Sequence, residues 1–110
     1  MGSGLLTGKM TRERIGKLPD DDWRKHHISF QEPRLSEHLA LVERLRTVGA
    51  RYGRSPGEVA IAWTLGHRAV AGAIVGARSA EQVDGVMNAG TLRLTNQERA
   101  EIEAASEVPA

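Results

Sequence analysis

The feature that most constrains the fold of this chain is a single short segment with the character of a buried β-strand. Residues 72–76 read Gly-Ala-Ile-Val-Gly, and a short apolar run between glycines is typical of a strand covered on both faces in a parallel sheet. Helices cannot satisfy the backbone N–H and C=O groups of a lone strand, and extended backbone from residues 2–8 would add only a marginal two-stranded sheet. The sequence therefore indicates part of a larger α/β unit.

Helices are predicted ahead of this segment from apolar spacing and from capping residues. Apolar residues follow helical spacing from Pro33 to about Tyr52, and Gly53 then ends the helix. Ser55 next provides an N-cap, with proline at the first helical position and glutamate at the third, which is a strong signal for a helix start. The helix over residues 55–65 is apolar nearly all round, so we expect it to be buried on more than one side.

Helices are also predicted after the segment, each from a capping box. Ser79 with Gln82 opens one of them, and Thr95 with Glu98 opens the last. The predicted strand is thus surrounded along the sequence by helices alone.

Composition excludes several classes of function. The chain has 110 residues, no cysteine, and 15 lysine and arginine residues against 14 aspartate and glutamate residues, for a net charge of +1. This balance argues against a nucleic-acid binder, and the lack of cysteine excludes disulfides, thiol catalysis and cysteine-ligated zinc. The histidines lack metal-ligand spacing, and no apolar run reaches the roughly 18 residues of a membrane span. We therefore expect a cytoplasmic protein that binds no nucleic acid, membrane or metal.

The sharpest candidate site is the junction between the predicted strand and the next helix. A helix that begins at Ser79, just after a buried strand ending at Gly76, presents free backbone N–H groups and its positive dipole end to a phosphate. Arg78 adds a guanidinium fork for the same phosphate, and Gln82 lies one turn into the helix. The alternative is purely structural: Ser79 and Gln82 cap the helix, and Arg78 is solvated.

Several motifs, in order along the chain, resemble the aldo-keto reductase family. They occupy residues 4–9 (Gly-Leu-Leu-Thr-Gly-Lys), 22–24 (Asp-Trp-Arg), 30–33 (Phe-Gln-Glu-Pro), 60–63 (Ala-Ile-Ala-Trp) and, above all, 74–82 (Ile-Val-Gly-Ala-Arg-Ser-Ala-Glu-Gln). Each motif alone is modest, but the ordered series extends over nearly the whole chain.

The resemblance implies an α/β fold in which the chain is a C-terminal fragment of a (β/α)8 TIM barrel, mostly helical with one or two short strands. Residues 1–110 would form a partial aldo-keto reductase domain, with a loop-rich N-terminal segment at 1–32 and helices around the last barrel strand at 33–110. A complete barrel takes roughly 250 residues, so the chain is expected to be less than half of one.

The resemblance also implies NADP(H) as the cofactor of the complete enzyme, held by the loops after the last two barrel strands. In the first of these loops, Ser3, Gly4 and Leu6 would lie near the pyrophosphate. The second loop would surround the adenosine 2′-phosphate, and the helix after it would contact the cofactor from its first turn. The residues of that second part are Gly76, Ala77, Arg78, Ser79 and Gln82.

The chain departs from the family pattern in two respects. Where many family members contact adenine with an acidic residue and an asparagine, it has Gly85 and Val86. The family's proton-donating tyrosine, with its lysine, histidine and aspartate, belongs to the first part of the barrel, and this chain is expected to begin after all of them. Its only tyrosine, Tyr52, is predicted to pack or cap at a helix end, so no catalytic residue is assigned.

Two functions are compatible with these features. The first is the C-terminal, cofactor-phosphate-binding part of an NADP-dependent aldo-keto reductase, an oxidoreductase that reduces carbonyls by hydride transfer. This part is expected to be inactive alone and to bind NADP(H) weakly at best, because half a site loses the nicotinamide contacts. The alternative is a non-catalytic interaction module, or split-enzyme subunit, that associates with itself or with a chain supplying the missing barrel strands.

Overall fold

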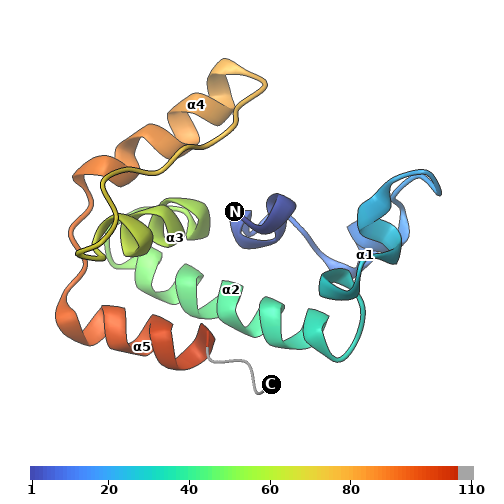
Figure 1. Cartoon of the computed structure of the whole chain (residues 1–110), viewed down its shortest axis with the longest axis horizontal. Helices are drawn as coiled ribbons and strands as arrows, with labels where there is room; N and C mark the ends of the chain where they lie inside the picture. Colours follow the sequence, from blue (N-terminus) through green and yellow to red (C-terminus); the bar gives the residue numbers. More distant parts are fainter. Residues whose placement is uncertain (107–110) are drawn as a thin grey trace.

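The computed structural model describes residues 1–106 and consists of helices and irregular segments over that range (Figure 1). The α-helices are interspersed with short 3₁₀ segments, which are labelled η. The elements in chain order are η1 (Gly2–Thr7), α1 (Arg12–Gly16), η2 (Trp23–His26), η3 (Ile28–Phe30), α2 (Arg34–Ala50), α3 (Pro56–Leu65), α4 (Ala80–Met87), η4 (Asn88–Thr91) and α5 (Asn96–Ser106).

The main core lies where α2, α3 and α5 meet. Leu45 and Val48 of α2 and Val59 of α3 are the largest fully buried side chains, and Ile102 of α5 joins the same cluster. Trp63 packs against this cluster and donates from Nε1 to the carbonyl oxygen of Arg99 at 3.3 Å. The predicted burial of α3 on more than one side is confirmed, because it packs on α2, η1, α4 and η4.

Local capping explains where the helices begin. In α3 the Ser55 hydroxyl accepts the Glu58 N–H at 3.2 Å, and the Glu58 carboxylate accepts the Ser55 N–H at 3.4 Å. The same exchange joins Thr95 and Glu98 at the start of α5, with distances of 3.1 and 3.0 Å. Both predicted helix starts are therefore confirmed, because each signal lies within four consecutive residues and needs no tertiary contact.

Glycines set the sharp turn between α2 and α3. Gly53 has a φ of 65°, in the left-handed region that glycine adopts without strain. At Gly49 a Cβ would lie 2.4 Å from the carbonyl oxygen of Arg54, so only glycine allows the returning chain to approach this closely. The predicted end of the helix near Gly53 is confirmed.

The N-terminal part is more ordered than its composition suggests. Residues 1–32 were expected to be loop-rich, and they form only short turns, but these turns enclose a second hydrophobic cluster. Leu5, Met10, Ile15 and Phe30 come together there with Leu35 from the start of α2. Isolated apolar residues in a glycine-rich stretch thus become core through tertiary contacts that have no sequence periodicity.

The predicted strand at residues 72–76 does not form. These residues follow an irregular, exposed course between α3 and α4, and the Ile74 side chain has a relative exposure of 105% instead of being buried on two faces. Residues 2–7 form η1, and Gly8 caps it in a left-handed conformation, so they provide no extended backbone and residues 1–106 contain no strand to pair with residues 72–76. The expectation of one or two short strands is corrected accordingly: an apolar strand sequence forms a strand only beside a partner.

Candidate functional site

A cleft lies between η1, the start of α3 and α4, and it brings distant parts of the sequence together. Its volume is about 530 Å³, and Gly4, Gly76 and Gln82 are among the residues that line it. In Figure 1, α4 and the segment before it lie away from α2 and α5, and α4 contacts α3. Three of the residues predicted for the cofactor site therefore share one cleft.

The junction at the start of α4 is held by its own side chains. The Ser79 hydroxyl accepts the N–H of Gln82 at 3.2 Å, and the Gln82 Oε1 atom accepts the N–H of Arg78 at 2.6 Å. Ser79 therefore caps α4, as predicted, but the predicted capping box is incomplete, because Gln82 accepts the N–H of Arg78 and not that of Ser79. This arrangement leaves the Gln82 amide nitrogen without a hydrogen bond within the described residues, and that nitrogen is a donor.

Arg78 carries the free charge of this junction. It is exposed and lies immediately before the N-cap of α4, where the helix dipole is positive. Among residues 1–106 its guanidinium forms no ion pair and no hydrogen bond, whereas Arg51 and Arg54 are paired with Glu98 and Glu58. An unpaired guanidinium beside free helix N–H groups suits a phosphate monoester.

The remaining predicted residues lie at or beyond the edges of the cleft. Ala77, Arg78 and Ser79 follow Gly76 directly but do not line it. Ser3 and Leu6 line a neighbouring cleft of about 440 Å³ that also contains Trp23. The structure therefore brings Gly4 to Gly76 and Gln82, and it places Ser3 and Leu6 on the other side of η1.

Backbone geometry in η1 is unusual and is supported from a distance. Ser3 and Gly4 have φ values of 54° and 97°, and the first of these is strained for a residue with a side chain. Arg24 donates from a guanidinium nitrogen to the Ser3 carbonyl oxygen at 3.5 Å. The same guanidinium donates two hydrogen bonds to the Asp22 carboxylate, at 3.0 and 2.6 Å, which fix its position and lower the pKa of Asp22 to about 2. The Asp-Trp-Arg motif thus helps to shape η1.

Lys9 is a lining residue that the sequence reasoning missed. It is exposed and contributes a cation to the cleft, just after Gly8, whose φ of 78° turns the chain. Two carboxylates also line the cleft. Glu58 is engaged by Arg54 at 3.2 Å and by its capping box, whereas Glu81, in the first turn of α4, is exposed and forms no ion pair among the described residues. The available signal was the Gly-Lys pair at the end of the motif at residues 4–9.

The two departures at residues 85 and 86 also lie in the cleft. Gly85 and the half-buried Val86 line its wall on α4. They offer an adenine ring apolar surface and no side-chain hydrogen bond. Gly85 and Val86, which depart from the resemblance, thus line the same cleft as Gly76 and Gln82, which match it.

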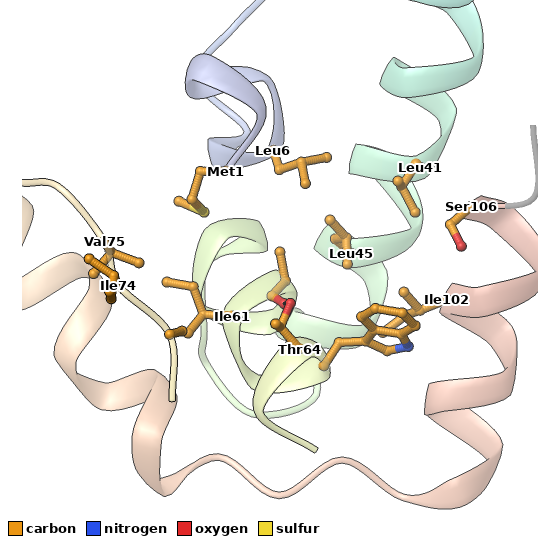
Figure 2. A pocket seen from close by; sticks show the side chains of 13 residues that line it. Met1, Leu6, Leu41, Leu45, Ile61, Thr64, Ile74, Val75, Ile102 and Ser106 are labelled. Atoms are coloured by element: carbon orange, nitrogen blue, oxygen red, sulfur yellow. The ribbon is translucent and has the colours of Figure 1, made fainter. Parts of the chain in front are cut away.

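A separate apolar groove lies on the other side of the irregular segment (Figure 2). Its volume is about 400 Å³, and it reaches from Ile74 and Val75 past Met1 and Ile61 to Ile102. Among residues 1–106, no three metal-ligating side chains gather in one place, and no helix is long and apolar enough to cross a membrane.

Tyr52 lies just after the end of α2, where it was predicted to pack or cap; it is partly exposed, and its hydroxyl donates to Glu98 Oε1 at 2.5 Å. Glu98 exposes only 4% of its surface and also accepts from Arg51 at 3.1 Å. The hydrogen bond to Glu98 raises the pKa of Tyr52. Burial opposes ionisation of Glu98, but its hydrogen bonds outweigh burial and lower the pKa of Glu98. These groups stabilise the junction of α2 and α5.

Comparisons with known proteins agree on one family. A family model described as "Aldo/keto reductase family" matches residues 1–107. The chain is 35% identical over 100 residues to the aldo-keto reductase YhdN of Bacillus subtilis (strain 168). This match covers 90% of this chain and 30% of that protein. It is 28% identical over 111 residues to the aldo-keto reductase str7 of Strobilurus tenacellus, covering 97% of this chain and 31% of the relative.

A solved structure supports the same relationship at the level of the fold. The structure of a glycerol dehydrogenase from Gluconobacter oxydans matches with a TM-score of 0.80 and 32% identity. The match covers 94% of this chain and 31% of that one. The chain thus spans less than a third of the length of the relatives it matches.

Proposed function

This chain belongs to the aldo/keto reductase family, and we propose that it is the C-terminal, cofactor-phosphate-binding part of an NADP(H)-dependent carbonyl reductase. In such an enzyme the chain would form the last portion of a (β/α)8 barrel, where the loops after the seventh and eighth strands hold phosphate groups. The proposal assigns to this chain the binding and orientation of the cofactor, and it assigns the proton transfer to the rest of the barrel.

The observation that carries the proposal is the cleft shared by η1 and α4. Residues more than 70 positions apart, Gly4 on one wall and Gly76 and Gln82 on the other, face a common space. Lys9 lies on one side of that space and Arg78 beside the other. Two separated cations suit a ligand with two separated phosphate groups better than a single anion.

Bound NADP(H) would supply the hydride for carbonyl reduction, and this chain would hold its phosphates. The Arg78 guanidinium would pair with the 2′-phosphate at the positive end of α4. The free amide nitrogen of Gln82 would donate to the adenosine side of the cofactor. Gly4, which lacks a side chain, would let the pyrophosphate approach the η1 backbone closely.

On this proposal the chain alone does not reduce carbonyls, because it contributes no catalytic residue. It also binds the nucleotide weakly, because the nicotinamide half of the site lies outside it and that binding energy is lost. Measurable NADPH-dependent reduction of a carbonyl by the pure chain would contradict the division of roles proposed above.

The proposal is tested by adding 2′,5′-ADP, which carries the 2′-phosphate and the first phosphate of the pyrophosphate but no nicotinamide, to the isotopically labelled chain. We expect amide chemical-shift changes to concentrate at Lys9, at residues 76–82 and in η1. The R78A variant should lose the changes at residues 76–82. Shifts spread evenly over the surface, or shifts that persist unchanged in R78A, would contradict the proposal.

A second candidate function rests on a different observation. Ile74, Val83 and Met87 are large apolar side chains with relative exposures of 105%, 42% and 67%, and they lie close together along the sequence. A surface of this kind is typical of proteins that associate with a partner. We propose association as a further property of the same chain rather than as a replacement for nucleotide binding.

A further inference from the structure

We propose that a cleft at the C-terminal end of α3 binds a small organic anion through Arg93 and Arg99. The ligand class is an oxyanion, a carboxylate or a phosphate ester, that carries a short apolar chain. This cleft is separate from the candidate cofactor site, so the proposal does not rest on the proposed function.

The cleft lies between the end of α3, η4 and the first turn of α5. Its volume is about 370 Å³, which is within the usual range for small-molecule sites. Leu65, Leu92 and Leu94 give it apolar walls, and Arg93 and Arg99 are the charged residues that line it. The candidate cofactor cleft is at the start of the same helix. Because α3 has 10 residues, its two ends lie about 15 Å apart, and the two clefts are distinct sites.

The guanidinium groups of Arg93 and Arg99 are held by backbone carbonyl oxygens and not by carboxylates. Arg93 Nη1 donates to the Gly90 carbonyl oxygen at 2.9 Å, and Arg99 Nη1 donates to that of Gly66 at 2.5 Å. Within the part of the chain that the structure describes, neither arginine forms an ion pair, and Glu103, one turn along α5, lies beyond ion-pair distance of Arg99. Each guanidinium has five N–H donors, so most of them remain free for an oxyanion.

This end of the molecule carries a local excess of positive charge. Residues 62–72 and 88–97 contain no aspartate or glutamate, and the first of these segments also includes the exposed Arg68. The next acidic residue is Glu98, whose carboxylate accepts from Tyr52 at the end of α2 and lines no part of the cleft. The whole chain is nearly neutral at +1, so the arginines at this end create a local potential that attracts anions.

The contacts of the two arginines separate helix capping from ligand binding. The last carbonyl groups of a helix carry a partial negative charge, and Arg99 offsets it at the end of α3 by donating to Gly66. The guanidinium fits there because Gly66 has no side chain, and a Cβ would overlap it. Arg93 does not reach α3, because its hydrogen bonds among residues 1–106 go to the neighbouring carbonyl oxygens of Gly90 and Leu92. Capping therefore accounts for Arg99 alone, and the second arginine points to a bound anion.

The test titrates the isotopically labelled chain with hexanoate, hexyl phosphate and the uncharged hexanol, and follows amide chemical shifts. We expect saturable changes at residues 62–66 and 90–94 with at least one of the two anions and none with hexanol. The tighter-binding anion identifies the oxyanion as a carboxylate or a phosphate. Acetate and inorganic phosphate lack the apolar chain and should bind at least about fivefold more weakly than the corresponding hexyl compound.

Three variants assign the binding to the two arginines. R93A removes one guanidinium without touching the cap of α3, and R99K keeps the charge but loses the planar fork. The matched control is R44A, which removes an exposed arginine on α2 that lines none of the clefts described above. We expect R93A and R99K to weaken binding of the hexyl anion at least about fivefold and R44A to leave it unchanged. Because R99K also alters the cap of α3, R93A decides the outcome, with circular dichroism as the check on helix content.

Equal shifts with hexanol, equal affinity of R93A and the wild type, or an equal loss in R44A would overturn the inference. The result is independent of the nucleotide. R78A should bind the hexyl anion as the wild type does, and R93A should keep the response to 2′,5′-ADP. A chain that binds the hexyl anion but not 2′,5′-ADP contradicts only the proposed function, and the reverse pattern contradicts only the anion site.

Discussion

Glu98 shows how one buried charge can hold two helices together. It is exposed to only 4%, and its carboxylate receives hydrogen bonds from Arg51, Tyr52 and the backbone N–H of Thr95. A buried carboxylate is costly unless its acceptor sites are filled. Here the donors come from the end of α2 and the start of α5, so the group both caps α5 and joins it to α2.

E98Q is predicted to lower the free energy of unfolding by about 1 to 3 kcal/mol, because it removes the charge that Arg51 and Tyr52 face. Urea denaturation followed by circular dichroism measures the effect. E103Q on the exposed face of the same helix is the matched control and should be nearly neutral. Equal stability of E98Q and the wild type would show that the network is dispensable.

The same network makes a prediction about pH. The pKa of Glu98 is lowered from its ordinary value of 4.5 in the folded chain, so the unfolded state binds the proton more readily. The stabilisation is then fully present above 4.5 and is lost as the pH falls through the lower folded pKa. The stability gap between wild type and E98Q should therefore narrow on acidification. A gap that widens on acidification would contradict the assigned direction.

At the scale of elements, α3 and α4 have similar caps and opposite surroundings. Both begin with a serine whose hydroxyl accepts a backbone N–H at 3.2 Å. Six residues of α3 are buried, whereas α4 buries none. Packing therefore holds α3, and α4 depends far more on local hydrogen bonds, since short isolated helices are marginal in water.

S79A is predicted to loosen α4 without unfolding the chain. Loss of an N-cap costs about 1 kcal/mol, which corresponds to roughly fivefold faster amide exchange within α4. S55A should instead lower the stability of the whole chain, so that amide exchange in α4 does not become faster than in the other helices by more than it is in the wild type. Slower or unchanged exchange in α4 of S79A would mean that its contacts with α3 hold it in place.

The sequence predicted the elements whose signals are local. The caps at Ser55, Ser79 and Thr95 and the turn at Gly53 each act within a few residues, and the structure has them all. Residues 72–76 failed as a strand because pairing requires a neighbour that periodicity cannot supply. The apolar pattern was real, but it describes an environment that residues 1–106 do not contain.

At the scale of the whole molecule, two hydrophobic clusters share one helix. The C-terminal half of α2 contributes Leu45 and Val48 to the main core, and its first turn contributes Leu35 to the N-terminal cluster. No disulfide cross-links either cluster, because the chain has no cysteine. The two parts are thus connected along α2 while their cores remain separate.

L45A is predicted to destabilise the whole chain, and F30A to unfold only its N-terminal part. L45A opens a cavity between α2, α3 and α5 and should destabilise the whole chain by about 2 to 5 kcal/mol. F30A should free residues 1–32 for proteolysis while exchange in α3 and α5 stays slow. Limited proteolysis with mass spectrometry distinguishes them. Global unfolding by F30A would show that the clusters form one cooperative unit.

The part of the candidate site that is contiguous in sequence could be predicted, whereas the part that tertiary packing brings together could not. The junction at residues 76–82 follows from a glycine, an arginine and a capping pair in sequence. The approach of Gly4 and Lys9 to that junction depends on how η1 packs against α2 and α3. No spacing rule connects residues so far apart, and only the family resemblance linked the two loops in advance.

The most direct test of phosphate binding is the ratio of the dissociation constants for NAD⁺ and NADP⁺, which differ only in the 2′-phosphate. Titration calorimetry on the wild type, on R78A and on R68A, which removes another exposed arginine ten residues away along the sequence, provides the comparison. We predict that wild type and R68A prefer NADP⁺ by at least about fivefold and that R78A loses this preference. Equal affinity of the wild type for both nucleotides, or an unchanged preference in R78A, would contradict the assignment of this chain as the phosphate-binding part of a reductase.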